Sequence, residues 1–419
     1  MSEFDKIIGY EDIKEKLIRL CDVIKNYEKY EKLGVNYPRG ILLYGEPGLG
    51  KTSMANCFIN EVGGEFFVLR KDDPNGEFVT KIKKTYEMAK SHAPAIVLLD
   101  DVDKFANADE LHPDAEEYVT VQSCIDECRG SKVFTLATAN NMGALPKSLR
   151  RVGRFDEVIY LRTPEGKESR EILEYYLKTK KVVRKLDIEE VTGIVEGKTC
   201  AELEAIVNEV GIYAGYEDRN EIEQKDIIRA CMKVLYDAYN SCDKIDEKSL
   251  RRIATHEVGH AVVTEHFLKG RVGVISLWKG NNGRGVCKNR GLDDYICSKE
   301  QMQQEVMIAL GGKAANEVVF GEVDMGSDSD IRKAYEMVEI YVDGLSAYNF
   351  RSTYYSEASN YKLENRDRQI DEELERLYNE SKKVIMEERA LLDALVEELI
   401  KKYLLTCRDV AKVRKKLKI

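Results

Sequence analysis

Apolar residues follow two different spacings along the first 163 residues. Short apolar runs, typical of buried strands, occupy residues 40–45, 65–70, 95–101, 132–140 and 157–161. Helical spacing of apolar residues covers 1–35, 51–62, 80–91 and about 115–129. Because strands that alternate with helices form parallel sheets, the pattern predicts an α/β domain whose sheet is covered by helices on both faces.

The pattern changes after residue 163. Residues 164–240 show helical spacing without strand-like runs, and the polar residues 241–249 resemble a linker. Residues 250–419 are mostly helical in pattern, with strand-like segments at 272–278 and 283–288. We therefore expect an α/β domain (1–163), a small helical domain (164–240), a linker (241–249) and a mostly α-helical domain (250–419).

Composition limits the class of protein. The 419 residues carry a net charge of -10, which gives no electrostatic reason to expect nucleic-acid binding. The ten cysteines include no CxxC pair and predict free thiols; Cys124 and Cys128 have helical spacing, which favours packing over a metal site. No apolar run is long enough to span a bilayer and no signal peptide is evident, so we expect a soluble, cytoplasmic protein.

The segment GEPGLGKTS follows the first predicted strand and opens a helix. Its glycines let the backbone wrap an anion, and the free N–H groups at the start of the helix favour negative charge. In a GxxxxGKT loop, Lys51 is expected to reach the β- and γ-phosphates, and Thr52 to hold Mg²⁺. The predicted phosphate cradle consists of Gly45, Glu46, Pro47, Gly48, Leu49, Gly50, Lys51, Thr52 and Ser53.

Polar residues end two later strands of the same domain. The run AIVLLDD ends in Asp100, expected to contact Mg²⁺ through water, and Asp101, expected to polarise the attacking water. The run TLATAN ends in Asn140, which is placed to orient that water beside the γ-phosphate. With the cradle, these residues predict that the first domain binds and hydrolyses a nucleoside triphosphate.

Two of the chain's five histidines, His256 and His260, lie four residues apart in IATHEVGHAVV. On a helix, this spacing projects both side chains from one face, where neutral imidazoles can share a Zn²⁺ ion. Glu257, next to the first histidine, is placed to take a proton from water. The apolar flanks predict a buried helix, and a metal is the simplest partner for histidines buried there.

A catalytic zinc site needs a third protein ligand. The segment GEVDMGSDSDIRKAYEMV offers three candidates, Asp324, Asp328 and Asp330. An aspartate in the first turn of a helix is also a favourable partner of the helix dipole, so spacing alone does not choose among the three.

The segment LPKSLRRVGRFDEVIYL resembles the second region of homology of the AAA+ ATPases. The resemblance implies that Arg151 and Arg154 act as arginine fingers across a subunit boundary, a role that contributes about 10³–10⁵ in rate. VEGKTCAELEAIVNEVGIYA is similar to the helical lid of that family. FDKIIGYEDIKEKL resembles its N-terminal stretch, which implies that the backbone near Gly9 meets the adenine.

The AAA+ module, the HExxH motif and the segments LGGKAANEVVFGE and GSDSDIRKA together resemble the FtsH family of ATP-dependent zinc metalloproteases. The similarity runs from Phe4 to about Val413. It implies that Asp330 is the third zinc ligand and that Glu317 orients a ligand. The remaining histidines match no ligand of the family: His92, His112 and His266.

The same resemblance implies what the protein works with. It implies ATP, Mg²⁺ and Zn²⁺ as cofactors, polypeptides as substrates, and a homohexamer as the assembly. The segment NGRGVCKN (282–289) would form an edge strand that pairs with the substrate backbone. Glu257 would activate water and later protonate the leaving amine.

Three features depart from the family pattern. The family usually has membrane-spanning helices before the ATPase module, and no such segment is present here. The second acid of the AIVLLDD strand is Asp101, whereas the family usually has glutamate, which predicts slow hydrolysis. The pore loop, usually aromatic and aliphatic, reads RKDDPNGEFVTK, with Asp72 to Asn75 at the loop position and Phe78 as a displaced candidate for gripping substrate.

Three functions are compatible with the sequence. The favoured one is an ATP-driven processive protease that degrades unfolded or damaged proteins. The second is an ATP-gated peptidase that cuts loose segments without unfolding domains. The third is a non-proteolytic remodelling factor with a structural zinc domain, which the intact Glu257 disfavours because a structural site needs no general base.

Overall fold

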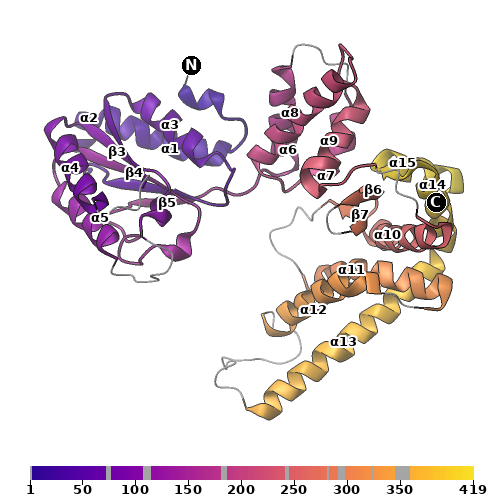
Figure 1. The fold of residues 1–419 in the computed structure, drawn as a ribbon. Helices are drawn as coiled ribbons and strands as arrows, with labels where there is room; N and C mark the ends of the chain where they lie inside the picture. Colours follow the sequence, from indigo (N-terminus) through magenta and orange to yellow (C-terminus); the bar gives the residue numbers. More distant parts are fainter. Residues whose placement is uncertain are drawn as a thin grey trace. The chain divides into compact units, whose positions relative to one another are not determined.

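The structure, a computed structural model, describes residues 2–71, 77–106, 115–180, 186–240, 245–280, 283–290, 298–322, 325–344 and 359–419. Internal contacts divide the chain into two compact units, residues 1–179 with 197–205 and residues 180–196 with 206–419 (Figure 1). This division passes through the predicted helical domain 164–240. The limits of that domain and of 1–163, 241–249 and 250–419 stay predictions.

The first unit is built on a five-stranded parallel sheet with strand order β2-β3-β4-β1-β5. Every strand predicted from the apolar runs is present, and the predicted α/β class is confirmed. The strands are β1 (Gly40–Tyr44), β2 (Glu65–Leu69), β3 (Ala95–Leu99), β4 (Val133–Ala139) and β5 (Glu157–Tyr160).

Helices cover both faces of this sheet, so its central strands are apolar on both sides. Alternate residues of β1 point to opposite faces of the sheet and belong to two cores. Ile41 and Leu43 pack with α1 (Glu11–Lys25) and α3 (Lys51–Val62), whereas Leu42 packs with α4 (Phe78–Ser91) and α5 (Glu116–Glu127). The helical elements are η1 (Glu3–Lys6), α1 (Glu11–Lys25), α2 (Tyr27–Glu31), α3 (Lys51–Val62), α4 (Phe78–Ser91), η2 (Val102–Lys104), α5 (Glu116–Glu127), η3 (Met142–Ala144) and α6 (Gly166–Lys178).

The second unit is mostly helical, as predicted, around a three-stranded antiparallel sheet of order β7-β6-β8. The strands are β6 (Val272–Gly280), β7 (Gly283–Asn289) and β8 (Leu404–Thr406). The sequence predicts β6 and β7 but not β8, because three residues are too few to show an alternating pattern. α8 (Cys200–Tyr216) has its first residues in unit 1 and continues in unit 2.

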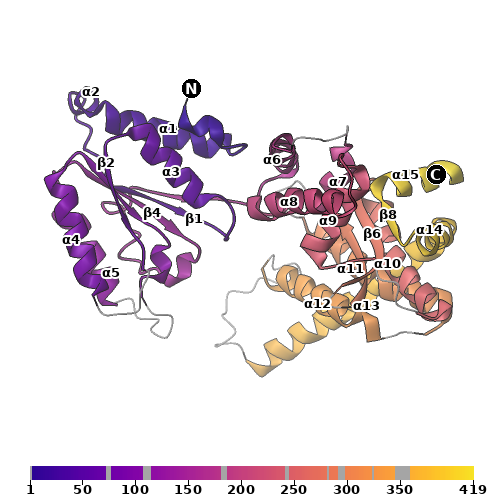
Figure 2. The same cartoon turned by 45° about the horizontal axis from the view of Figure 1, so that its top comes forward.

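Two long helices of this unit, α10 and α11, pack closely against each other, and α10 also packs on the sheet (Figure 2). Glycines permit the close approach, since a Cβ at Gly259 would lie 2.6 Å from the Cβ of Ala315. The remaining bounds are α7 (Ile188–Val195), α9 (Gln224–Tyr236), α10 (Glu247–Phe267), α11 (Lys299–Phe320), η4 (Met325–Ser327), α12 (Asp328–Asp343), α13 (Asn360–Glu387), α14 (Arg389–Lys402) and α15 (Cys407–Leu417).

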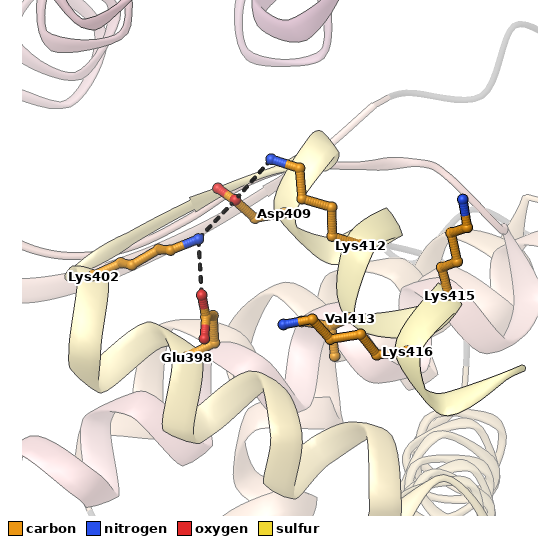
Figure 3. Close-up of a pocket in the computed structure, with 7 residues that line it drawn as sticks. All are labelled: Glu398, Lys402, Asp409, Lys412, Val413, Lys415 and Lys416. Atoms are coloured by element: carbon orange, nitrogen blue, oxygen red, sulfur yellow. Dashed lines mark hydrogen bonds and ion pairs between the residues drawn. The ribbon is translucent and has the colours of Figure 1, made fainter.

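The last two helices, α14 and α15, are joined by an ion pair between Lys402 and Asp409. Lys402 lies 2.8 Å from Glu398 and 2.9 Å from Asp409, at one side of a surface hollow of about 370 Å³ (Figure 3). Lys415 and Lys416 also line this hollow. The lining holds more lysines than acids, because Lys412 lines it as well, so the hollow is basic in character.

Within the described ranges, none of the helices combines the length and the apolar character needed to span a bilayer.

Candidate functional site

The phosphate cradle connects β1 to α3 and is shaped by glycines in left-handed backbone conformations. Gly48 has φ 83° and Gly50 has φ 86°, values that other residues rarely adopt. The ammonium of Lys51 donates to the carbonyls of Gly45 (2.8 Å) and Glu46 (2.6 Å). Burial lowers the pKa of Lys51. The loop therefore curves around the ammonium of Lys51 at the start of α3. An anion bound there would meet this positive charge and the free N–H groups of the helix.

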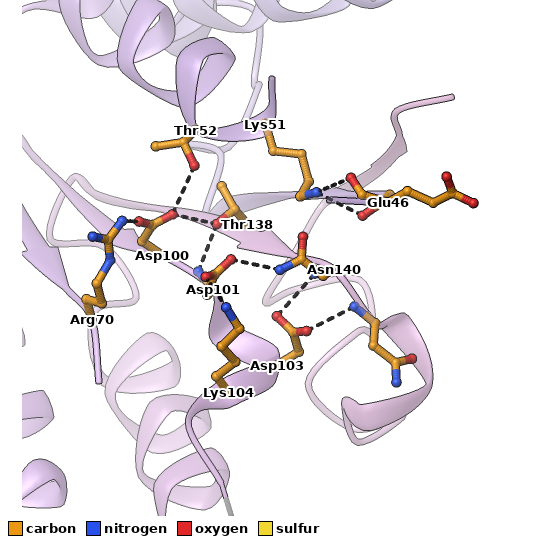
Figure 4. Close-up of polar contacts among 12 residues, drawn as sticks. Glu46, Lys51, Thr52, Arg70, Asp100, Asp101, Asp103, Lys104, Thr138 and Asn140 are labelled. Atoms are coloured by element: carbon orange, nitrogen blue, oxygen red, sulfur yellow. Dashed lines mark hydrogen bonds and ion pairs between the residues drawn. The ribbon is translucent and has the colours of Figure 1, made fainter. Parts of the chain in front are cut away.

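The first predicted magnesium contact lies beside the cradle. Asp100, whose side chain is 3% exposed, accepts a hydrogen bond of 2.8 Å from Thr138, and its Oδ1 lies 3.4 Å from the hydroxyl of Thr52 (Figure 4). Its other oxygen, Oδ2, is paired with the guanidinium of Arg70. The hydroxyl of Thr52 and the carboxylate of Asp100 are oxygen donors, the ligand type that Mg²⁺ requires, so these residues fit the ion.

Asp101 and Asn140, predicted as hydrolytic residues, are in contact. The amide Nδ2 of Asn140 donates to Oδ1 of Asp101 over 3.0 Å, and Lys104 pairs with Oδ2 of Asp101 at 2.6 Å. Asp103 was not predicted as a site residue. Its carboxylate accepts the backbone N–H groups of Asn140 (3.1 Å) and Asn141 (3.0 Å). Asp103 thereby fixes the end of β4; its position three residues after Asp100 is the signal that could have identified it.

A hollow of about 230 Å³ adjoins the cradle in the same unit. Its lining includes Ile8 and Tyr10, the neighbours of Gly9, so it lies where the adenine is expected. Gly9 has φ 74°, and the carboxylate of Glu168 accepts the N–H of Tyr10 over 3.0 Å, which fixes this turn. Ser53, Tyr176 and Cys200 line the same hollow.

The two candidate arginine fingers differ in environment. Arg154 is only 7% exposed, and its guanidinium binds Asp126 (2.7 Å), Gln122 (2.5 Å) and the carbonyl of Ser148 (2.6 Å). Arg151 is exposed. An arginine finger must extend beyond the surface of its own subunit to enter a neighbouring one. The burial of Arg154 therefore disfavours this role for Arg154, and the same role for Arg151 stays a prediction.

The idea that Phe78 grips substrate is wrong. Phe78 begins α4, is 7% exposed and packs edge-to-face on Phe105 with ring centres 4.8 Å apart. It belongs to the core beneath the sheet, because the apolar face of α4 starts at this residue. Asp72 to Asn75, at the predicted loop position, lie outside the described residues.

In the second unit, His256 and His260 project from α10 toward Asp330 in the first turn of α12. The Nε2 atoms of the two histidines lie 3.2 Å apart, and Oδ2 of Asp330 lies 3.0 Å from the first and 3.4 Å from the second. Both histidines are 9% exposed. Of the three candidate aspartates, Asp330 is the one beside the histidines. Asp328 faces Arg332, and Asp324 lies outside the described residues.

This cluster fits a zinc ion. Two ligands at ~2.0–2.1 Å from a tetrahedral Zn²⁺ lie about 3.3–3.4 Å apart, close to the three separations observed. Nδ1 of His260 donates to the carbonyl of Ile308 over 2.8 Å, which leaves Nε2 with its lone pair toward the cluster. Nδ1 of His256 is buried without a hydrogen-bond partner in the described part of the chain.

The electrostatics of the cluster reflect three ligand groups close together. Burial lowers the pKa of His260, but the hydrogen bond and the charge of Asp330 outweigh it, so that the pKa is raised. Burial would raise the pKa of Asp330, but the two histidines hold it well below its usual range. Burial also raises the pKa of Glu257.

Two glycines, neither of them predicted as a site residue, close the cluster on two sides. A Cβ at Gly312 on α11 would lie 2.6 Å from Nε2 of His260 and 2.7 Å from Nε2 of His256. A Cβ at Gly285 on β7 would lie 3.0 Å from Cδ of Glu257, and its φ is 108°. The glycines of LGGKAANEV were a signal, since paired glycines inside a helix mark a close approach.

The expectation that Glu317 orients a zinc ligand is wrong. Its carboxylate accepts a hydrogen bond from the hydroxyl of Tyr378 and lies 3.1 Å from Lys382, and both contacts lower its pKa. Glu317 therefore joins α11 to α13. His266 pairs with Glu388 at 3.2 Å, and His92 is exposed; neither lies in the cluster. His112 lies outside the described residues.

Two protein families match successive parts of the chain, and each part contains one of the two sites. Residues 41–163 match the ATPase family associated with various cellular activities (AAA). Residues 243–413 match peptidase family M41. The first match contains the phosphate cradle and the second contains the histidine–aspartate cluster.

Curated relatives align over nearly the whole chain. ATP-dependent zinc metalloprotease FtsH 2 of Phytoplasma mali is 29% identical over 98% of this chain, and FtsH 2 of Thermoanaerobacter is 26% identical over 97%. ATP-dependent zinc metalloprotease FtsH of Thermus thermophilus is 28% identical over 98%. The chain spans 62% of the length of the Phytoplasma relative, 82% of the Thermoanaerobacter relative and 70% of the Thermus relative.

Proposed function

Because an AAA match precedes a peptidase M41 match and FtsH metalloproteases align over nearly the whole chain, we propose that this protein is an FtsH-like ATP-dependent zinc metalloendopeptidase. Its substrates would be unfolded or damaged proteins. One observation carries the proposal: His256, His260 and Asp330 bring three ligand atoms as close to one another as the ligands of a single zinc ion. The cluster lies beside Glu257, in a chain that also has a phosphate cradle.

The peptidase chemistry follows from the cluster. His256, His260 and Asp330 would hold zinc, which supplies polarisation of the scissile carbonyl when it is bound. Glu257 takes a proton from the attacking water and later gives it to the leaving amine. Burial of Glu257 raises its pKa toward the range in which a carboxylate both accepts and donates a proton.

The polypeptide substrate would pair with the outer edge of β7. β7 pairs with β6 on one side only in the described sheet, and it carries Gly285 beside Glu257. A substrate strand added to this edge would bind through its backbone, independently of most side chains, close to the general base.

The ATPase residues have matching roles. Lys51 and the N–H groups of the cradle would hold the phosphates of ATP. Thr52 would hold Mg²⁺, Asp100 would contact the ion through water, and Asp101 with Asn140 would orient the attacking water. Asp101 is one methylene shorter than glutamate, and Lys104 pairs with it, so we expect slow hydrolysis. Hydrolysis would drive or gate substrate delivery to the peptidase unit.

The active assembly would be a ring, by family resemblance a homohexamer, because an arginine finger acts in trans. A gated peptidase is the second candidate function. It is favoured by the burial of Phe78, which removes the one aromatic side chain considered for gripping substrate.

A degradation assay tests the proposal. Casein should be degraded with ATP and Mg²⁺, more slowly without ATP, and not at all after zinc chelation. Resistance of casein under every condition, in protein that retains zinc, would contradict the metalloendopeptidase. A stably folded tagged domain separates the two candidates: degradation indicates unfolding, whereas persistence beside casein cleavage indicates a gated peptidase.

A further inference from the structure

The carboxylate of Asp100 already has a cation beside it. Its Oδ1 accepts from Thr138 over 2.8 Å and lies 3.4 Å from Thr52, and its Oδ2 accepts from the guanidinium of Arg70 (Figure 4). Since Oδ1 faces the two hydroxyls, Oδ2 is the oxygen with lone pairs left for a metal ion or for a water molecule bound to that ion. Arg70 occupies that oxygen.

Strand pairing brings Arg70 to this place. β2 pairs in parallel with β3, and the N–H of Asp100 donates to the carbonyl of Leu69 over 2.9 Å. Arg70 follows Leu69 directly, so its side chain starts next to Asp100. The Arg70 side chain is 57% exposed, whereas that of Asp100 is 3% exposed. The cation can therefore leave toward solvent, but the anion cannot.

A buried carboxylate needs a counter-charge. Two cations are available to Asp100 in turn, the guanidinium of Arg70 and Mg²⁺ when ATP brings it. Both require the lone pairs of Oδ2, and two positive charges at one carboxylate repel each other.

We propose that Arg70 is a positioning residue of the ATPase, which neutralises Asp100 before nucleotide binds and competes with Mg²⁺ for its Oδ2 oxygen. The proposal rests on the ATPase function proposed above. Mg²⁺ entry requires Arg70 to leave, so Arg70 raises the Mg²⁺ concentration that tight ATP binding requires. Binding of ATP without metal does not involve Oδ2, so it responds to loss of Arg70 only as it responds to loss of another nearby positive charge.

Lys104 provides a matched control. Its ammonium lies near the same site but pairs with Asp101, at 2.6 Å, and is 64% exposed. Removing either cation changes the local field by one positive charge. Only the removal of Arg70 frees an oxygen of Asp100.

The test is a Mg²⁺ titration of binding of a fluorescent, non-hydrolysable ATP analogue, followed by anisotropy. Arg70→Gln should lower the Mg²⁺ concentration at half-saturation about 2- to 5-fold, the change that loss of a partly exposed ion pair produces. Arg70→Lys, which keeps the charge, should change it less. Lys104→Gln should leave it near the wild-type value, and analogue binding in chelator should be equal in the two variants that each lose one positive charge, Arg70→Gln and Lys104→Gln.

Other outcomes have definite meanings. An equal fall in Arg70→Gln and Lys104→Gln would indicate a general field and would overturn the competition. A rise in Arg70→Gln would make Arg70 a support of the metal site and would also overturn it. No analogue binding to the wild-type protein would contradict the ATPase function itself. If Arg70→Gln fails to fold, an unchanged Mg²⁺ requirement in Arg70→Lys and in Arg70→Met would overturn the proposal.

Discussion

The Nε2 atoms of His256 and His260 face each other across 3.2 Å, one helical turn apart, with Oδ2 of Asp330 within 3.4 Å of both. Without a metal, two imidazole nitrogens and a carboxylate at these distances compete for protons. A bound metal ion would accept a lone pair from each of these three atoms. This relationship makes metal content the most direct property to measure.

We expect about one zinc per chain in purified protein. His260→Ala should lose it, because two remaining ligands bind far more weakly than three. His266→Ala is the matched control, since His266 lies on the same helix but pairs with Glu388. Metal analysis of the three proteins checks this prediction, and undiminished zinc in His260→Ala would remove that histidine from the site.

Replacing Glu257 with Gln should keep the zinc but reduce cleavage by at least ~10²-fold, the usual contribution of a general base. The amide has nearly the shape of the carboxylate but cannot accept the proton of water. Casein cleavage and zinc content should be measured on one preparation. Proteolysis at the wild-type rate in this variant would exclude Glu257 from the mechanism.

Gly312→Ala should weaken zinc binding. The added methyl group would lie 2.6 Å from Nε2 of His260, so the imidazoles must move away from their ligand positions. Overpacking of this kind costs about 1–3 kcal/mol. Gly215→Ala is the control, because it also adds a methyl group to a helix of this unit but meets open space. Equal zinc affinity in the two variants would contradict the close fit of α11 to the cluster.

The sequence predicted those parts of the sites that lie in one continuous segment. The phosphate cradle and the HExxH helix are local, so spacing alone gives their geometry. Asp330 comes 70 residues after His260, and only the family resemblance distinguished it from Asp328. Where a residue's role depends on packing between elements, prediction failed: Phe78 joins a core, and Glu317 joins two helices.

The contacts made by Gly312 and the strand pairing that places Arg70 could not be predicted from the sequence either. The role of Gly312 depends on how closely α11 crosses α10, and that of Arg70 depends on which strands are neighbours. Neither follows from periodicity, which predicts that an element exists but not which residues of two elements meet. The fold class could be predicted because alternating strands and helices have few possible arrangements.

The two arginines predicted as fingers should give different phenotypes. Arg154→Ala should lower the melting temperature, because it leaves Asp126 and Gln122 without their partner. Arg151→Ala should leave the melting temperature unchanged but reduce ATP hydrolysis by up to ~10³–10⁵-fold. Thermal melts and ATPase rates of both variants check this.

A mixing experiment tests the action in trans. Rings assembled from Arg151→Ala and Lys51→Ala chains should recover part of the ATPase activity, because an intact finger can meet an intact cradle. Co-assembly must be verified by pull-down of a tagged chain. If verified mixed rings recover no ATPase activity, Arg151 does not act across the subunit boundary.

The pH dependence of the metal-free protein follows from two pKa shifts of opposite sign. The pKa of His260 is raised, so its contribution to stability is complete below the unfolded value of ~6.5 and is lost as the pH rises through the folded value. The pKa of Asp330 is lowered, so its contribution is complete above ~3.9 and is lost as the pH falls through the folded value. Their ion pair therefore contributes most between about pH 4 and 6.5.

Chelator-treated protein should accordingly melt at a lower temperature at about pH 8.5 than at pH 6, by about 2–4 °C for each kcal/mol that is lost. Zinc-loaded protein should not show this decrease, because zinc needs unprotonated imidazoles and binds more tightly as the pH rises. Asp330→Asn is the control: without the carboxylate, His260 loses the partner that raises its pKa, so the decrease should be smaller. Scanning calorimetry of the metal-free proteins measures the effect. An equal decrease in the wild-type protein and in Asp330→Asn would show that other groups cause it.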